Sequence, residues 1–556
     1  MPSELDRQYD AAFAAVTGEG GRIPLGRDAG GQAVAATFPA TVPVLFDVFC
    51  AFYGPMEAAI AGGERLTFAD LNREATRLAR ALAGAGIGKS DRVAIAMRNC
   101  PAWIVAWMAV LKAGGIATLI NGWWQTDEMR HALALTEPKL VIADAPRAKR
   151  VEATGLGLAT VTLPVERPIG EAIASLLGTE ADLPAIAPED DATILFTSGS
   201  TGLAKGAVST HRAVTTATYA YAITLATLIA IKESQGESPP PPRTLVNLPL
   251  FHVTGEIPVL LNSFVIGRTM VLMPKWDAGE ALRLIAEEKI TYFVGVPTMS
   301  LELMQHPDRE KYDLSSLTDI AAGGAARPVA HVERLEASFK DAKPAQGYGL
   351  TETNAVGCGN FWSNYHDKPA STGRPQRPIV DLVILGEDDR HLPQGERGEI
   401  AIRSAANIRG YWNNPAATEA AFTADGYFRT GDVGYLDADD YLFIVDRKKD
   451  IIIRGGENIS AQEVEAALYG HPLVSEAAVF GIADERLGEI PVAVVYSEQG
   501  GLDQQALLGF VAAHLAQFKL PAQIWFSAEP LPKLGTGKID KLTLRKTYGG
   551  KPAGPA

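Results

Sequence analysis

Residues 197–206 combine the chemical groups that proteins use to hold a phosphate. Their sequence is Thr-Ser-Gly-Ser-Thr-Gly-Leu-Ala-Lys-Gly, and it directly follows the apolar run 192–196, which is typical of a buried strand. A glycine-rich loop at this place lets backbone N–H groups approach a phosphate, and the hydroxyls and Lys205 add donors and positive charge. A flexible Gly/Ser linker is the alternative. The spacing does not match a G-x-x-x-x-G-K phosphate loop.

Residues 348–352 bring together a second set of nucleotide-binding groups. They read Tyr-Gly-Leu-Thr-Glu. The aromatic ring of Tyr348 can stack on a base, the hydroxyl of Thr351 can bind a phosphate oxygen, and the carboxylate of Glu352 can bind Mg²⁺. Taken alone, the same stretch could be the end of a strand that carries an ordinary surface acid.

Three further segments complete a pattern. Residues 427–432 (YFRTGD) precede residues 445–450 (VDRKKD), and residues 532–539 (PKLGTGKI) lie near the C-terminus. In this order and spacing, the segments resemble those of the adenylate-forming (ANL) superfamily, in particular its AMP-dependent fatty acid–CoA ligases. The resemblance covers residues 66–546.

The resemblance implies an α/β fold with two domains. The large N-terminal domain of parallel sheets flanked by helices is placed at residues 1–446 and binds AMP and the acyl group. A small, mobile α+β lid domain is placed at residues 447–556, with a hinge near 446–449 at Lys449. The length agrees, because 556 residues exceed what one hydrophobic core usually organises.

Hydrophobic patterns predict individual elements. Helices are expected at 69–85, 461–468 and 504–517, and strands at 91–97, 474–481 and 492–496. Ser460 and Glu463 form a capping-box pattern at the start of helix 461–468. The apolar stretch 102–124 predicts a buried helix and strand rather than a membrane helix. The proline-rich segment 231–242 and the extension before Val42 have no assigned role: covering a pocket mouth or an interface is one alternative, and solvated loops are favoured.

The resemblance also implies the reaction. A carboxylic acid and ATP form acyl-AMP and pyrophosphate, and CoA then displaces AMP to give a thioester. The expected ligands are the acid, ATP, Mg²⁺ and the co-substrate CoA. Charge develops at phosphorus during the first step, so fixed positive groups that stabilise this transition state are expected to contribute most to catalysis. Catalytic roles are implied for Lys205, His252, Thr351, Glu352 and Lys538.

Nucleotide contacts are implied along all of these segments. Residues 197–205 would surround the β- and γ-phosphates, Tyr348 would stack on adenine, and Asp432 and Arg447 would bind the ribose. The implied set is Thr197, Ser198, Gly199, Ser200, Thr201, Gly202, Lys205, Gly324, Ala325, Tyr348, Gly349, Thr351, Asp432, Arg447, Lys538, Gly455 and Gly456.

Metal binding and the two half-reactions require further roles. Glu352 and Thr197 are the implied Mg²⁺ ligands. Lys538 would bridge the carboxylate and the α-phosphate during adenylation, which is a proximity effect combined with charge neutralisation. Rotation about the hinge would then withdraw Lys538 and bring residues 455–458 to a channel for CoA.

Substrate choice depends on residues 250–266. The segment 250–255 matches the family segment that closes over the carboxylate, so His252 is expected to orient the acid or to gate CoA entry. Residues 257–266 are largely aliphatic, without a lysine or arginine that would demand a second carboxylate. Glu256 lies off the position where amino-acid-activating relatives hold an ammonium group. A medium-to-long-chain fatty acid is favoured, followed by an aryl or arylpropenoic acid.

Other functions remain open at this point. An adenylating enzyme that transfers its acyl group to a carrier protein would use the same motifs. A luciferase-like oxygenase and a nucleotide-binding regulator without catalysis are further alternatives. Release of pyrophosphate separates an enzyme from a pure binding module.

Composition restricts the partners and the compartment. The formal charge is −14 and the pI about 5.3, which argues against binding of nucleic acid or an anionic membrane. Three cysteines without paired or zinc-ligand spacing suit a reducing compartment, and the N-terminus lacks the regions of a secretory signal. We therefore expect a cytoplasmic protein with no nucleic-acid partner and no membrane span. A homodimer is compatible with the sequence, which does not decide the oligomeric state.

Overall fold

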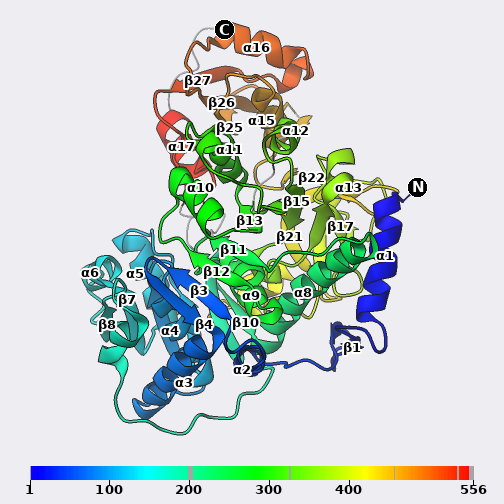
Figure 1. The fold of residues 1–556 in the computed structure, drawn as a ribbon. Helices are drawn as coiled ribbons and strands as arrows, with labels where there is room; N and C mark the ends of the chain where they lie inside the picture. The colour runs from blue at the N-terminus through cyan, green and yellow to red at the C-terminus, as the bar shows by residue number, and fades with distance from the viewer. Residues whose placement is uncertain are drawn as a thin grey trace.

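The computed structural model describes residues 2–197, 204–324, 327, 329–455, 457–534 and 537–549. Within these ranges the chain forms a large unit with sheets of seven, nine, four and two strands and, coloured orange to red in Figure 1, a smaller unit with one five-stranded sheet at the C-terminal end. The mixed α/β architecture predicted from the sequence is confirmed. Seven of the predicted site residues lie outside the described residues: Ser198, Gly199, Ser200, Thr201, Gly202, Ala325 and Gly456.

The first large sheet contains the strand that leads into the predicted phosphate loop. Its seven strands follow the order β20 (Gly410–Tyr411), β10 (Lys205–Thr210), β9 (Asp191–Thr197), β6 (Ile116–Leu119), β5 (Arg92–Ala96), β7 (Leu140–Asp144) and β8 (Thr160–Leu163). The run from β9 to β8 is parallel. The predicted helix and strand within 102–124 are confirmed as α4 (Pro101–Lys112) and β6, and every residue of both is buried. Strands and helices covered on all sides produce such continuous apolar runs.

The second large sheet is the floor of the site. Its nine strands are β17 (Arg374–Pro375), β16 (Cys358–Phe361), β15 (Lys343–Tyr348), β14 (Asp319–Ala322), β13 (Tyr292–Gly295), β11 (Arg243–Val246), β12 (Thr269–Leu272), β3 (Glu57–Ala61) and β4 (Glu64–Thr67). Strands β15, β14, β13, β11 and β12 are parallel. Their carboxyl ends therefore meet at one edge, where ligands bind in open α/β sheets.

Two smaller sheets complete the chain. The third sheet is antiparallel and contains β18 (Asp381–Leu385), β19 (Gly398–Arg403), β21 (Phe428–Leu436) and β22 (Leu442–Arg447). The C-terminal sheet contains β24 (Glu457–Ile459), β23 (Ile452–Arg454), β26 (Gly488–Tyr496), β25 (Glu476–Asp484) and β27 (Gln523–Ser527). A separate cluster of buried residues lies against it, which includes Val464, Val479 and Val511.

Most predicted element positions are confirmed, with two corrections near the C-terminus. Helix α3 (Phe68–Gly84), β5, β25, β26 and α15 (Ala461–Tyr469) lie where the patterns place them. Ser460 caps α15 by accepting from the Glu463 N–H, but the Glu463 carboxylate pairs with Lys519 at 2.6 Å. Helix α16 (Gln504–Ala512) ends before the predicted residue 517, where a separate short turn, Gln517–Lys519, begins.

The N-terminal extension is not a solvated loop, as the sequence suggested, but begins with helix α1 (Glu4–Thr17). It packs against α8 (His211–Ser234) and lies beside α13 (Trp362–Asp367), on the right in Figure 1. The short strands β1 (Leu25–Arg27) and β2 (Ala33–Ala35) then lead to α2 (Val42–Phe52). Helix α8 also runs into the segment predicted as a loop from residue 231. The residues that hold α1 are distant in sequence, so local patterns do not reveal its docking.

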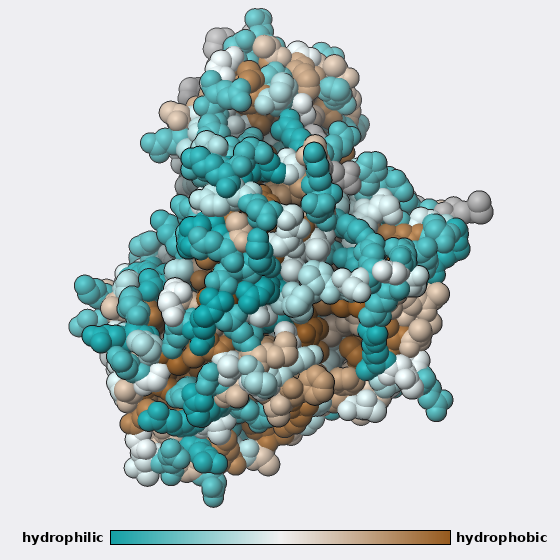
Figure 2. Space-filling model, in the orientation of Figure 1, coloured by the Kyte–Doolittle hydropathy of each residue, from teal (hydrophilic) through white to brown (hydrophobic). Residues whose placement is uncertain are grey.

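The surface is mixed in character. Hydrophilic residues cover much of the face in Figure 2, and hydrophobic ones gather in patches over its lower half, where α2 lies in Figure 1. Val44, Val48 and Phe52 of α2 are among the exposed hydrophobic residues. In the described part of the chain, α8 alone is long and apolar enough to cross a membrane, and 67% of its most apolar stretch is buried.

Candidate active site

Adjacent strand ends bring the predicted ribose and adenine residues together. Tyr348 ends β15, Asp432 lies in β21, and Arg447 ends β22 directly opposite Asp432. The Tyr348 hydroxyl donates to Asp432 Oδ2 at 2.7 Å, and Arg447 Nε lies 3.2 Å from Asp432 Oδ1. Burial and the neighbouring Asp432 raise the pKa of Tyr348, so this hydroxyl stays a donor. The sequence predicted the three residues but not this network, which holds Asp432 in place from both sides.

Glu352 lies in a short turn, Thr351–Thr353, that follows β15. Tyr411 donates its hydroxyl to Glu352 Oε1 at 2.9 Å, and Lys205 Nζ lies 4.8 Å from the centre of the Tyr411 ring. Tyr411 reaches this place because β20 pairs with β10, the strand that Lys205 begins. The sequence did not point to Tyr411, because no motif marks it and only the strand pairing places it between the two predicted residues.

The surroundings of Glu352 suit a hard cation. Burial raises its pKa, and Arg447 and Lys205 act in the opposite direction. Tyr411 uses one oxygen of the carboxylate, so acceptor capacity remains for a metal bound together with phosphate oxygens, as Mg²⁺ prefers. Thr197, the other predicted metal ligand, ends β9. The residues therefore fit the metal that the resemblance implies.

Lys538 reaches this site from the C-terminal unit. Gly324 has a φ of +76°, and a Cβ built there would lie 3.3 Å from Lys538 Cε and 3.6 Å from Nζ. The loop that carries Lys538 is held by Lys533, whose Nζ lies 3.3 Å from Glu302 and 2.9 Å from Glu476. A side chain in place of Gly324 would thus press on the lysine that the sequence singled out.

Burial and the neighbouring charges bring the pKa of Lys538 close to neutral pH. Burial, together with the charge of Arg447, lowers its pKa to about 8, and Asp432 and Glu352 act in the opposite direction. His252 lies near enough that Lys538 adds to the effect of burial, which together lower the pKa of His252 to about 3. The Thr254 N–H lies 3.3 Å from His252 Nδ1, so the neutral ring carries its proton on Nε2. His252 is therefore a hydrogen-bond donor and not a cation.

We expect adenylation to weaken as pH rises through about 8. The role that the resemblance implies for Lys538, neutralising two anions, requires its protonated form, and the protonated fraction is complete well below its pKa and is lost above it. The measurement is the pH profile of kcat/KM for ATP, which reports groups of the free enzyme. Lys538→Arg should remove the alkaline fall, because arginine remains charged. A profile that stays flat through this range in the unaltered protein would contradict the expectation.

The remaining predicted residues show more limited contacts. A Cβ at Gly349 would lie 2.2 Å from the Ala355 carbonyl oxygen, so only glycine fits beside the adenine segment. The Gly455 N–H donates to the Leu487 carbonyl at 2.7 Å, and no hydrogen bond among the described residues joins it to the nucleotide site. Glu256 is fully buried without a hydrogen-bond partner in the described part of the chain, and burial raises its pKa to about 8.

A cavity of about 730 Å³ extends from this site along the second sheet. Gly323, Gly324 and Gly347 line the end next to Lys538. Apolar side chains from α8, from 254–266 and from β13 form the walls, among them Leu225, Leu228, Ile229, Pro258, Ile266 and Val294. The dimensions and the apolar walls suit an acyl group, since ligand pockets of several hundred cubic ångströms are mostly apolar.

The far end of the cavity corrects two expectations. Arg268 and Lys232 line it, although the sequence indicated no cation in the acyl region. The residues Pro239, Pro240, Pro241 and Pro242 and five residues of α1 (Leu5, Asp6, Tyr9, Asp10, Phe13) also line it. These two segments thus form part of the cavity wall, which agrees with the alternative that they cover a pocket and not with the favoured prediction of solvated loops.

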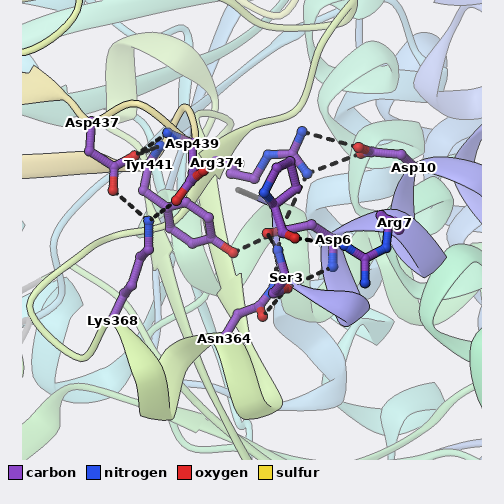
Figure 3. Close-up of polar contacts among 11 residues, drawn as sticks. Ser3, Asp6, Arg7, Asp10, Asn364, Lys368, Arg374, Asp437, Asp439 and Tyr441 are labelled. Carbon is purple, nitrogen blue, oxygen red and sulfur yellow. Dashed lines mark hydrogen bonds and ion pairs between the residues drawn. The ribbon is translucent and has the colours of Figure 1, made fainter.

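Buried polar contacts hold α1 over the cavity (Figure 3). Asp6 is 4% exposed, and its Oδ1 accepts from Asn364 Nδ2 at 3.0 Å and from the Tyr441 hydroxyl at 2.9 Å. Arg374 Nη1 lies 3.3 Å from the same oxygen and 3.1 Å from Asp10 Oδ1. One carboxylate therefore fixes α1 to helix α13, to strand β17 and to the residue that precedes β22.

Two family models match the chain. The model described as AMP-binding enzyme matches residues 46–412, and the model described as AMP-binding enzyme C-terminal domain matches residues 463–538.

Characterised relatives and solved structures resemble most of the chain. A long-chain-fatty-acid–CoA ligase, FadD13, from Mycobacterium tuberculosis is 35% identical over 491 residues, which are 87% of this chain and 93% of the relative. A feruloyl-CoA synthase from Amycolatopsis sp is 36% identical over 491 residues, 88% and 95% of the two chains. The structure of o-succinylbenzoate coenzyme A synthetase from Bacillus subtilis with ATP and a magnesium ion superposes with a TM-score of 0.74 at 27% identity, covering 89% and 98%.

Proposed function

Because this chain belongs to the family of AMP-binding enzymes and is an AMP-forming acyl-CoA synthetase, we propose that it activates a medium-to-long-chain fatty acid, using ATP with Mg²⁺ and then CoA. The observation that carries the proposal is the position of Lys538 against Gly324, at the mouth of an apolar cavity. Asp432, Glu352 and Arg447 all influence the charge of this lysine. Lys538 thus lies beside both the predicted nucleotide-binding residues and the cavity proposed to hold the acyl group.

The first half-reaction joins two anions. A carboxylate oxygen of the acid forms a bond to the α-phosphorus, and the bond from that phosphorus to pyrophosphate breaks. Protonated Lys538 would hold the carboxylate and the α-phosphate together, and His252 Nε2–H would donate to the carboxylate. Glu352 and Thr197 would hold Mg²⁺, which supplies neutralisation of phosphate charge. Asp432 and Tyr348 would fix the ribose and adenine.

The second half-reaction needs a different arrangement of the same chain. The CoA thiol loses its proton to solvent and its sulfur attacks the acyl carbon, and AMP leaves with the electrons of the broken acyl–oxygen bond. Lys538 occupies space beside the acyl end in the present arrangement, so the thiol needs it withdrawn. We place the hinge at Lys449, in the turn after β22, where the N–H of Asp450 bonds the Arg447 carbonyl at 2.9 Å.

Lys449→Pro should therefore spare adenylation and reduce thioester formation by at least about tenfold, because proline fixes φ at the hinge. The measurement compares pyrophosphate release with CoA thioester formation from added acyl-AMP. Lys449→Ala is the matched control, since it removes the side chain but leaves the backbone free. Equal effects of the proline on both half-reactions would place the hinge elsewhere.

The test of the function is AMP formation against straight-chain acids of increasing length, with and without CoA. Turnover that needs Mg²⁺ and CoA and peaks on aliphatic acids supports the proposal. Pyrophosphate release without stimulation by CoA would favour a carrier-protein acceptor. The absence of AMP with every acid would reject the proposed substrate class.

An aryl or arylpropenoic acid is the second candidate. The similarity to feruloyl-CoA synthase favours it to the same degree as the similarity to the fatty-acid ligase favours the first. The cavity also contains Tyr221, Tyr348 and Phe361, whose rings could contact an aromatic substrate. Cinnamic and ferulic acids therefore belong in the same panel.

A further inference from the structure

The far end of the acyl cavity is polar. Tyr292 and Asp319 begin β13 and β14, whereas Gly295 and Ala322 end these strands at the side of the active site. Three residue steps separate the two ends of β13, or roughly 10 Å of extended chain. Arg268 lies just before β12, at the same far edge of the sheet as Tyr292. The cavity thus runs from Lys538 to a cationic group about one strand length away.

Arg268 is buried, and two of its guanidinium nitrogens find no hydrogen-bond acceptor in the described part of the chain. It is 4% exposed, and its Nε and Nη1 have no hydrogen-bond partner among the described residues. Its guanidinium lies 4.7 Å from the centre of the Tyr292 ring. Burial lowers its pKa to about 10, which still leaves it charged at neutral pH. The stacking compensates part of the burial, but a ring face does not satisfy N–H groups that lie in the guanidinium plane.

The neighbouring carboxylate is already engaged elsewhere. Asp319 Oδ2 lies 3.2 Å from Lys232 Nζ and accepts from the Thr318 hydroxyl at 2.8 Å. Asp319 Oδ1 accepts from Trp362 Nε1 at 3.2 Å. No ion pair joins Arg268 to a carboxylate in the part of the chain that the structure describes. The other charged side chains at this end, among them Asp6, Asp10, Lys232, Asp319 and Arg374, are paired with one another, whereas Arg268 has no carboxylate partner among the described residues. An unpaired buried charge is costly.

A ligand that supplied an oxygen would relieve this cost. The Oδ1 atom of Asn262, which also lines the cavity, has no hydrogen-bond partner among the described residues either. An aliphatic chain end would leave both groups without partners. A keto, hydroxyl or carboxylate oxygen would accept from Arg268, and a hydroxyl could also donate.

We propose that Arg268 binds an oxygen at the end of the substrate remote from the reacting carboxylate, so that the preferred acids have an apolar body and an oxygenated far end. This rests on the proposed function, because it assigns the substrate class of the same cavity. Arg268 would be a specificity-determining residue about one strand length from the reacting atoms, and not a catalytic one.

The test uses acids of one chain length that differ only at the far end. We would measure kcat/KM for decanoic acid, its ω-hydroxy and ω-oxo derivatives and decanedioic acid, in the unaltered protein and in Arg268→Met. A charged hydrogen bond predicts a preference for at least one oxygenated acid of about ten- to a hundredfold. Arg268→Met should remove this preference and leave decanoic acid unimpaired. The panel also shows which oxygen group is bound.

Arg243→Met is the matched control, because Arg243 begins the adjacent strand β11 but pairs with Glu57 and Glu288. It should keep the preference of the unaltered protein. If Arg268→Met does not fold, Arg268→Lys, which keeps a charge with fewer donors, should retain part of the preference.

Two results overturn the inference. One is a preference of the unaltered protein for decanoic acid over every oxygenated acid, and the other is a preference that persists in Arg268→Met. In both cases the acids are still converted to CoA thioesters with release of AMP, so the proposed function stands. Failure of all acids, straight-chain and aryl included, would reject the proposed function and the inference together.

Discussion

Replacing Lys538 by alanine is expected to lower the rate of acyl-AMP formation by about a hundred- to a thousandfold, the usual effect of removing a preorganised charge-stabilising group. The variant loses the ammonium group that lies against Gly324 and whose pKa is shifted by the charges of Arg447, Asp432 and Glu352. Two repelling anions would then have to approach without a cation between them. Pyrophosphate release at saturating ATP measures the effect.

The same variant should convert preformed acyl-AMP and CoA to thioester at nearly the unaltered rate. Lys546→Ala is the control, since this lysine lies exposed on α17 (Lys541–Tyr548) of the same unit, and it should change neither half-reaction. A loss of less than about tenfold in acyl-AMP formation would remove Lys538 from the proposed role. An equal loss in both half-reactions would indicate a structural effect instead.

The second large effect is expected for Asp6→Ala. Asn364, Tyr441 and Arg374 all direct polar hydrogens to the Asp6 carboxylate, and the substitution would leave these groups facing an apolar methyl. Removing one partner of a buried charged pair costs about 3–5 kcal/mol. The cost falls on one helix, so we expect α1 to detach locally while the rest of the fold persists.

Detachment of α1 should appear in two measurements. Limited proteolysis should cut within Glu4–Thr17 at least about tenfold faster, since cleavage follows the population of the open form. The acid profile should broaden towards longer acids, because five residues of α1 line the cavity.

Asp10→Ala is the matched control for this prediction. Asp10 pairs with the same Arg374 at 3.1 Å, but its side chain is 57% exposed, so its loss should cost less than about 1 kcal/mol. Unchanged proteolysis and an unchanged acid profile in Asp6→Ala would show that α1 does not depend on this carboxylate.

The sequence was most informative at positions where a function or a backbone conformation requires one particular type of residue. Glycines and hydroxyls beside a lysine indicate a phosphate site, and the spacing of Tyr348, Glu352, Asp432 and Lys538 indicated the superfamily. The buried strands were predictable for the same reason, because a short, continuous apolar run between turn residues has to be covered on both faces. The family and the overall architecture followed from these local signals.

Other parts of the site depend on contacts that no local pattern records. Tyr411 reaches Glu352 only through the pairing of β20 with β10. Arg268 lies two residues beyond the aliphatic segment, and its sequence neighbours do not reveal which cavity it lines. Helix α1 has an ordinary amphipathic sequence, whose partners are several hundred residues away. The roles of residues 198–202 in phosphate binding remain predictions.

The docking of α1 also determines when the molecule is completed. The hydrogen bond between Asp6 and Tyr441 joins residues 435 positions apart, and a free helix of 14 residues is only marginally stable in water. Synthesis proceeds from the N-terminus, so α1 leaves the ribosome before its partners and must wait for Asn364, Arg374 and Tyr441 to be made. The cavity that α1 lines therefore cannot close until the 435 residues after Asp6 have been added to the chain.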